Sequence, residues 1–140
     1  MDNQNFKNHT RFVPGFHLLT GLSILAALAI AIIMVLHKGV SHETVFFLLV
    51  GLSLVLLFWY IRKFAAGNQD RIIRLEENLR SQRLTGKMSD NRLTRGQIIA
   101  LRFAGDDEYV ALSERAIKEN MSPKEIKQAI QNWRSDHHRI

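Results

Sequence analysis

The histidines are the side chains of this sequence best suited to chemistry near neutral pH, because their charge changes there. His37 and His42 stand close together in a short polar stretch, where two imidazoles could bind one metal ion. Zinc sites usually have three or four protein ligands, and this stretch offers no third partner. The sequence also lacks cysteine, which excludes thiolate sites and disulfides. We predict no metal site and no cofactor.

Two further clusters resemble parts of a cation-binding or acid–base site. Asp106, Asp107 and Glu108 are consecutive, so their carboxylates would point in different directions on a helix. A negatively charged first helical turn explains them better. The segment Asp136–His138 has no partner elsewhere in the sequence, and we interpret it as a polar terminus. Because the sequence contains no glycine-rich phosphate loop, nucleophile elbow or HExxH motif, we predict that the protein is not an enzyme.

Two long apolar runs dominate the sequence, and the rest of the chain is organised around them. The first extends from Gly15 to Leu36 without a charged side chain, and the second extends from Val45 to Ile61. As helices they would be about 33 Å and about 26 Å long, close to the thickness of a bilayer hydrocarbon core. We predict an all-α membrane protein with a two-helix transmembrane hairpin, its helices at about 15–36 and 45–61.

The apolar runs allow two other interpretations. They could be buried helices of a soluble protein, although core helices in so small a chain are usually shorter and amphipathic. The first run could also be a signal peptide cleaved near Ala29-Ile30-Ala31. The apolar run continues past that point to Leu36, which argues against cleavage.

The cations that flank the runs predict the orientation of the hairpin. Lys7 and Arg11 precede the first run, Arg62 and Lys63 follow the second, and the connecting loop carries only Lys38. The positive-inside rule then places both termini in the cytoplasm. The net charge is +6, and its excess lies directly after the second run. The residues predicted to contact lipid headgroups or an acidic partner are Arg62, Lys63, Arg71, Arg74, Arg80 and Arg83.

Small residues predict how the membrane helices pack. Ser23, Ala27 and Ala31 recur every four residues and share one helix face, where backbones can approach closely. Gly51 would supply part of the matching surface on the second helix. This face could hold the hairpin together or join separate copies of the protein, and the sequence favours neither.

The tail before the first run, residues 1–14, is polar with Phe6, Phe12 and Val13 interspersed. Aromatic rings beside cations suit the headgroup region, so the tail could lie at the cytoplasmic membrane interface. A disordered leader is the alternative.

Residues 62–92 predict a basic, amphipathic helix that continues out of the membrane and ends in a polar linker. Ile72, Leu75 and Leu79 form a narrow apolar stripe, which predicts packing against a neighbour. Only about two heptads are present, too few to assign a coiled coil. Two i,i+4 ion pairs are expected on this helix, Asp70 with Arg74 and Glu76 with Arg80.

Residues 93–140 predict a small cytoplasmic domain of three short helices. The capping boxes Thr94–Gln97 and Ser122–Glu125 each mark a helix start. Asp106 is expected to cap the middle helix, and the last helix is expected to run through Trp133. So small a core needs support from the preceding helix, a second copy or the membrane. The predicted core and interface residues are Ile98, Phe103, Ile117, Ile130 and Trp133.

The last two predicted helices allow one test for nucleic-acid binding. As a helix-turn-helix they would carry Lys124, Lys127, Gln131 and Arg134 on the face opposite the apolar one. A solvated face has the same composition, and residues 103–140 carry slightly more acidic than basic groups. We therefore do not favour nucleic acid as a partner.

Four segments of this sequence are more specific than a generic membrane hairpin requires. They are QNFKNHTRFVP in the tail, QDRIIRLEENLR after the second run, and LTRGQIIALRFAGDDE and IKQAIQNWRSDHHR towards the end. These segments resemble a family of small bacterial two-helix membrane proteins known only as a domain of unknown function. The resemblance implies two membrane helices, a cytoplasmic helical part and a bacterial cytoplasmic membrane, and it implies no activity, cofactor or catalytic residue.

These features together predict a non-enzymatic, integral inner-membrane protein. Its cytoplasmic helices would make it a structural, assembly or accessory subunit, either through its own copies as a homo-oligomer or within a larger membrane protein complex. One alternative is a small oligomeric channel or transporter lined by Thr20, Ser23 and Ser53. Another is a membrane-tethered nucleic-acid-binding protein. No small-molecule substrate is predicted.

Overall fold

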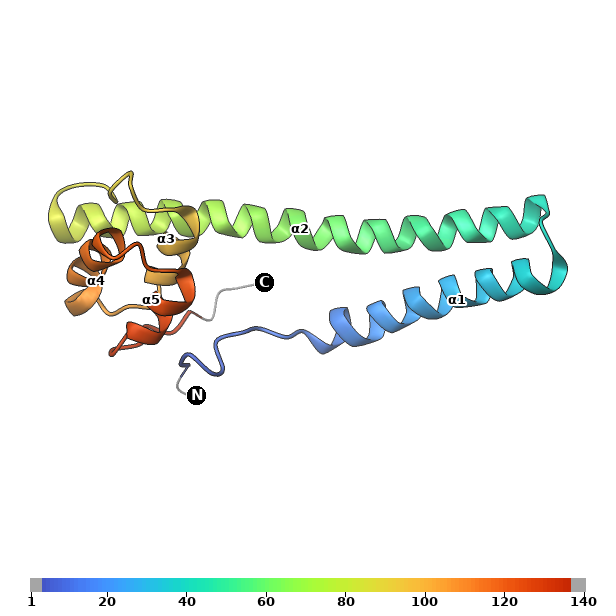
Figure 1. Cartoon of the computed structure of the whole chain (residues 1–140), viewed down its shortest axis with the longest axis horizontal. Helices are drawn as coiled ribbons and strands as arrows, with labels where there is room; N and C mark the ends of the chain where they lie inside the picture. Colours follow the sequence, from blue (N-terminus) through green and yellow to red (C-terminus); the bar gives the residue numbers. More distant parts are fainter. Residues whose placement is uncertain (1–3, 137–140) are drawn as a thin grey trace. The chain divides into compact units, whose positions relative to one another are not determined.

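The computed structural model describes residues 4–136, and the prediction of an all-helical chain is confirmed there. Within this range the only extended pairing is an isolated antiparallel bridge between Ala104 and Trp133. The elements are η1 (Gly15–Thr20, a π-helix), α1 (Gly21–Lys38), α2 (His42–Thr85), α3 (Arg95–Leu101), α4 (Asp106–Lys118) and α5 (Pro123–Ala129) (Figure 1).

The chain divides into two compact units, which we call the hairpin unit and the helical unit. The hairpin unit is Phe12–Ala65. The helical unit contains, within the described range, residues 4–11 and 66–136. The boundary between the units falls within α2, which is continuous as predicted. Of the tail, residues 4–11 group with the C-terminal helices and residues 12–14 group with the hairpin.

In the hairpin unit, α1 and the first half of α2 lie side by side and are joined by a tight turn (Figure 1). Gly39 has a φ of 75°, a left-handed conformation that glycine adopts without steric cost. After the turn, the Thr44 hydroxyl donates to the carbonyl oxygen of Gly39 over 3.0 Å, and the Ser41 amide donates to Thr44 Oγ1 over 2.9 Å. Both helices are long and apolar enough to cross a membrane, as the sequence predicted.

The two helices of the hairpin unit meet along a seam that uses every third or fourth residue. This spacing is that of a left-handed pair of packed helices. A Cβ on Gly51 would lie only 3.2 Å from the Cα of Leu28, so glycine allows the backbones to approach. Further along the seam, the rings of Phe16 and Phe58 stack with centroids 4.5 Å apart. The less exposed positions of α2 in this unit are Thr44, Leu48, Gly51, Val55, Phe58 and Ala65.

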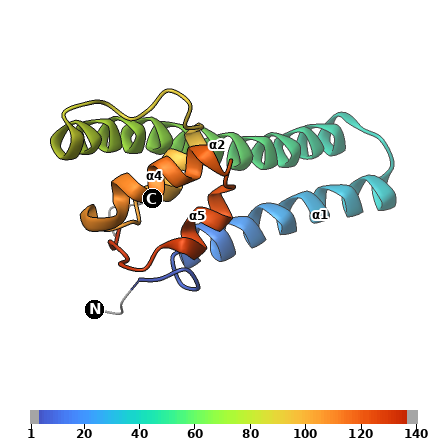
Figure 2. The same cartoon turned by 60° about the vertical axis from the view of Figure 1, so that its left-hand side comes forward.

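The helical unit is built from α3, α4 and α5, which pack together beside the last turns of α2 (Figure 2). Both predicted capping boxes are confirmed, with Thr94 beginning α3 and Ser122 beginning α5. Leu84, near the end of α2, packs against the same core, so the three short helices are supported by the preceding helix. The fully buried side chains of this core include Leu101, Phe103, Ala104 and Ile126.

The start of α4 differs from the prediction. Its N-cap is Gly105, and no side chain caps the helix. Asp106 is the first helical residue, and its carboxylate accepts hydrogen bonds from Arg80 and Arg83 instead of a backbone amide. The predicted cap was therefore wrong, because a charged partner from α2 holds the aspartate.

The end of α5 is also earlier than predicted. The helix ends at Ala129, and Ile130 has a ψ of 125°, which is extended. Trp133 therefore reaches the core from a non-helical segment, and not from a helix face. That segment is held by two backbone hydrogen bonds of 2.8 Å, from the Gly105 amide to the Asn132 carbonyl and from the Arg134 amide to the Phe103 carbonyl.

Residues 4–11 of the tail belong to the helical unit. The Asp136 amide donates to Gln4 Oε1 over 2.8 Å, and Gln4 Nε2 donates to the Asp136 carbonyl over 3.3 Å. The His9 ring lies against two aromatic rings of the core, with centroids 5.6 Å from Phe103 and 5.8 Å from Trp133. Residues 4–11 of the tail are therefore bound to the helical unit and do not form the disordered leader considered from their composition. A position of the tail at the membrane interface stays a prediction.

Candidate functional site

Arg80 lies at the centre of a buried ion network in the helical unit. Its guanidinium donates to the Ala104 carbonyl over 2.6 Å, to Asp106 Oδ1 over 2.7 Å and to Glu77 Oε2 over 3.2 Å. Its Cζ also lies 4.5 Å from the centre of the Tyr109 ring. These contacts need the planar fork and several donors of arginine, which a lysine does not have. The network joins α2 to α4 and to the connection before it.

The two carboxyl groups bound to Arg80 respond differently to their surroundings. Desolvation raises the pKa of Glu77, and the charge of Arg80 opposes that shift. The hydrogen bond from Arg80 lowers the pKa of Asp106, whose side chain is half exposed. Arg134 places a second guanidinium 3.8 Å from Glu77 Oε1. Asp106 therefore stays ionised further into the acid range than an ordinary aspartate.

The predicted surface role of Arg80 is contradicted by its position. Only 5% of Arg80 is exposed, because its donors are used inside the helical unit. Arg83 is different, because its side chain is 66% exposed while it bonds Asp106 Oδ2 over 2.7 Å. The other predicted basic residues, Arg62, Lys63, Arg71 and Arg74, are exposed, and their contact with lipid or an acidic partner stays a prediction.

The acidic cluster at the start of α4 holds the C-terminal segment in place. The Glu108 carboxylate accepts hydrogen bonds of 3.0 Å from the amides of Gln131 and Asn132. Asp107 Oδ2 accepts one from the side-chain amide of Asn132 over 2.5 Å. Because these amides lie just beyond α5, the carboxylates redirect the chain where that helix ends. No local sequence pattern indicates this contact, since the partners stand more than twenty positions apart.

The small residues of the hairpin unit do not all serve the same contact. Ala31 is buried, and Gly51 is buried against Leu28. Ser23 and Ala27 are exposed on the outer surface of α1, and the Ser23 hydroxyl donates to the Leu19 carbonyl of its own helix over 2.7 Å. Of the four predicted packing residues, only Ala31 and Gly51 therefore lie in the seam between the two helices.

The predicted core residues of the helical unit gather in one cluster. Ile98, Phe103 and Ile130 are buried, and Ile117 and Trp133 are half-buried against them. Sequence reasoning missed the contact of the tail with this core, which His9 makes through its ring beside Phe103 and Trp133. No periodic pattern marks a single ring that reaches a core from a distant tail.

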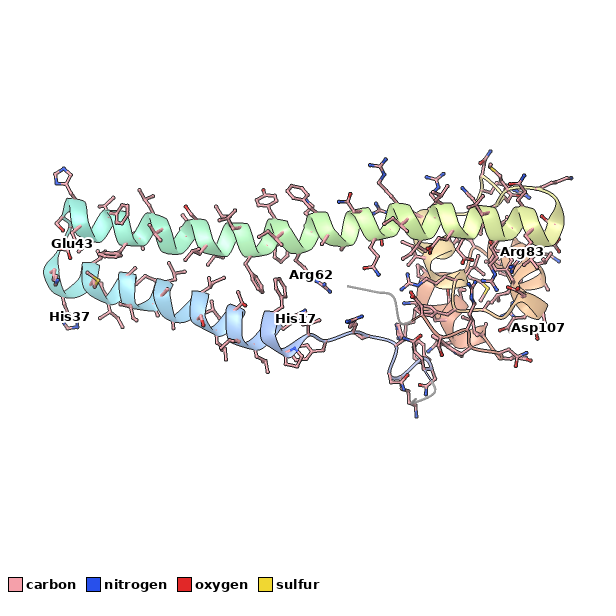
Figure 3. All side chains as sticks on the ribbon, turned by 180° about the vertical axis from the view of Figure 1, so that it is seen from behind. His17, His37, Glu43, Arg62, Arg83 and Asp107 are labelled. Atoms are coloured by element: carbon pink, nitrogen blue, oxygen red, sulfur yellow. The ribbon has the colours of Figure 1, made fainter. Side chains whose placement is uncertain are left out.

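The described residues contain no group of three or more His, Cys, Asp or Glu side chains that could hold a metal ion. Figure 3 shows His37 and Glu43 at the turn of the hairpin unit, and His17 and Arg62 at its opposite end. His137 and His138 lie outside the described residues. The structure therefore assigns no metal centre between residues 4 and 136.

The basic face considered for nucleic-acid binding is partly occupied. Lys127 Nζ lies 3.1 Å from His9 Nε2 and 5.7 Å from the centre of the Phe103 ring. Arg134 lies beside Glu77, as described above. Two of the four candidate contacts are thus already engaged within the helical unit.

The apolar stripe after the hairpin is exposed. Ile72, Leu75 and Leu79 are 58%, 61% and 57% exposed, although they belong to a regular helix. The two i,i+4 ion pairs predicted beside them do not form. Arg80 turns to Glu77 and Asp106, and Asp70 lies 3.8 Å from Arg95.

The fold and these surfaces define an all-helical protein with two helices long enough and apolar enough to span a membrane, and with a compact helical unit tied by internal ion pairs. The chain belongs to DUF6526, a family of unknown function, whose model matches residues 1–140. The resemblance to an uncharacterised family is thus confirmed over the whole chain. No curated protein and no solved structure matches it.

Proposed function

We propose that the protein is a non-enzymatic, integral protein of the bacterial cytoplasmic membrane that presents its helical unit for assembly with other protein chains. The observation that carries this proposal is the outward direction of apolar side chains in the hairpin unit. In the most apolar 18-residue stretch of each of its two helices, only 6% and 11% of the stretch is buried. A core helix of a soluble protein would be mostly buried, whereas lipid would cover these side chains favourably.

The connectivity of the units supports a hairpin with both ends on one side of the membrane. The hairpin unit begins at Phe12 and ends at Ala65, and each end continues directly into the helical unit. The binding of the tail to that unit through Gln4 and His9 supports a single compartment for the tail and the C-terminal helices. Positive charge after the second helix favours the cytoplasm as that compartment.

An assembly role is supported by how the polar groups are used. The carboxylates that the sequence offered for chemistry, Asp106, Asp107 and Glu108, hold the helical unit together. The apolar stripe on α2 offers a surface for another chain, because the contacts of the described helical unit leave it exposed.

The channel alternative receives no comparable support. The hydroxyl of Thr20 donates to the Gly15 carbonyl over 3.1 Å, and that of Ser23 donates to the carbonyl of Leu19. These hydroxyls are therefore satisfied within their own helices and need no water-filled pore.

Alkaline carbonate extraction of membranes containing the full chain tests the proposal. An integral hairpin stays in the membrane pellet and is released only by detergent, because its outward apolar side chains are covered by lipid. Recovery of the full chain in the carbonate supernatant, or in the soluble fraction without detergent, would overturn the proposal.

A further inference from the structure

The segment of α2 that belongs to the helical unit has two different sides. Ile73 and Glu77 are buried against the rest of the unit, and Arg80 is bonded there. Ile72 and Leu75, on another side of the same helix, are more than half exposed, and Leu79 shares their stripe. The chain therefore covers one side of this helix itself and leaves an apolar side open.

We propose that the open side pairs with the same side of a second copy as a short, parallel, two-stranded coiled coil. In heptad terms, Ile72 and Leu79 occupy a positions and Leu75 occupies the d position between them. Isoleucine at a with leucine at d favours two parallel strands. The neighbouring d positions, Asn68 and Gln82, are polar, so they limit the apolar contact to about two heptads.

Charge complementarity points to a second copy as the partner. Arg71 occupies the g position before Ile72, and Glu76 occupies the e position after Leu75. In a parallel pair, each g residue faces the e residue of the next heptad in the partner, so two arginine–glutamate pairs would form. In an antiparallel pair like charges would meet. Both side chains are exposed, and the ion pairs found among the described residues use neither of them.

This inference rests on the proposed membrane anchoring, which also supplies the direction. Two copies inserted in one membrane with the same topology have parallel α2 helices. Two heptads are weak alone, but confinement in a membrane raises the effective concentration of the partner. The helix advances about 27 Å from Ile61, at the end of the second apolar run, to Leu79. The far end of the stripe is therefore distant from the apolar run, and a second copy suits the stripe better than a lipid surface does.

Disulfide cross-linking in native membranes tests the pairing, because the natural chain has no cysteine. Leu75→Cys should give a disulfide-linked dimer on mild oxidation, since d positions face each other across a parallel pair. Arg74→Cys is the matched control. Arg74 is also exposed and is adjacent in sequence, but it does not lie on the stripe. It should give little dimer.

Charge reversal then tests the register. In the Leu75→Cys background, Arg71→Glu or Glu76→Arg should each lower the dimer yield by a factor of roughly three to ten, because attractive pairs become repulsive. The two reversals together should restore it.

The outcomes separate this inference from the proposed function. If the chain stays in the carbonate-resistant pellet but Leu75→Cys cross-links no better than Arg74→Cys, the self-pairing is wrong and the stripe is left to lipid or another protein. If the charge reversals change nothing, or if the double variant is not restored, the parallel register is wrong. Loss of the chain from the pellet would instead refute the anchoring.

Discussion

At the scale of single residues, Arg80 joins parts of the helical unit that are distant in the sequence. Arg80→Met would leave Glu77 buried without its nearest cation and would free Asp106 from its shortest ion pair. Breaking a buried pair in this way costs about 3 to 5 kcal/mol. We expect a corresponding fall in the free energy of unfolding, measured by urea denaturation of the full chain in detergent with Trp133 fluorescence in a Trp59→Phe background.

Arg83→Met is the matched control for this experiment. Arg83 bonds the same carboxylate of Asp106, but its side chain is mostly exposed. An exposed pair of this kind contributes at most about 1 kcal/mol. Equal losses of stability for the two variants would contradict the central role of the buried arginine.

The acid stability of the helical unit should depend on Asp106. Its pKa is lowered in the folded chain from the ordinary value of 3.8, chiefly by the hydrogen bond from Arg80. A lowered pKa means that its contribution is present above the unfolded pKa and is lost as the pH falls through the folded pKa. Asp106→Asn should therefore destabilise the unit near neutral pH and flatten the loss of stability on acidification.

Glu77 should act in the opposite sense. Burial raises its pKa, so its proton stabilises the fold below the unfolded pKa, and this contribution disappears as the pH rises through the folded value. Urea midpoints of the wild-type and Asp106→Asn chains, measured from neutral pH down to about pH 3, separate the two effects. If the urea midpoint falls equally steeply with decreasing pH in both chains, the acid sensitivity does not come from Asp106.

Sequence reasoning succeeded for residues whose partners are close along the chain. Thr94 and Ser122 were predicted as capping residues because a capping box is complete within four residues. Arg80 was instead assigned to the surface, because its partner Asp106 and the Ala104 carbonyl follow only after the whole of α3. A charged residue in an amphipathic helix gives no local sign that a distant carboxylate will bury it.

At the scale of elements, Gly51 sets how closely the two helices of the hairpin unit approach. Gly51→Leu would place a side chain against Leu28, whose Cα already lies 3.2 Å from an added Cβ. The helices should separate, so oxidation of a Phe16→Cys/Phe58→Cys pair in the full chain should yield less intramolecular disulfide. These two rings stack in the hairpin unit, which makes their positions a sensitive reporter of helix separation.

Ser53→Leu is the control for the glycine variant. Ser53 is exposed on the same helix. Its replacement by leucine introduces the same side chain as Gly51→Leu, but outside the seam. The disulfide yield should stay at the level of the parent pair. A loss as large as that of Gly51→Leu would show that the seam is not where the structure places it.

Element boundaries illustrate where sequence patterns stop being informative. The continuation of α2 to Thr85 follows from its composition and was predicted, and Gly86 with a φ of 73° ends it. The end of α5 was placed too late, because Ile130 and Trp133 keep helical spacing after the helix has ended. Glu108, from α4, captures the amides beyond α5, and this is a tertiary contact.

At the scale of the whole molecule, an apolar hairpin unit with exposed side chains continues at both ends into one helical unit. The apolar runs were evident in the sequence, whereas the binding of the tail to the C-terminal helices was not. That contact rests on single residues such as Gln4 and His9, which no periodic pattern distinguishes. This contact supports the proposal, which the charge distribution also favours, that the tail and the C-terminal helices share one compartment.

Labelling of single cysteines with a membrane-impermeant maleimide tests this claim most directly. Val40→Cys lies in the turn of the hairpin unit, and Asn91→Cys lies on the exposed surface of the helical unit. In intact bacterial cells that express the full chain, we predict that the maleimide labels Val40→Cys at once. It should label Asn91→Cys only after the membrane is permeabilised. Labelling of Asn91→Cys in intact cells, or protection of Val40→Cys until permeabilisation, would contradict the account.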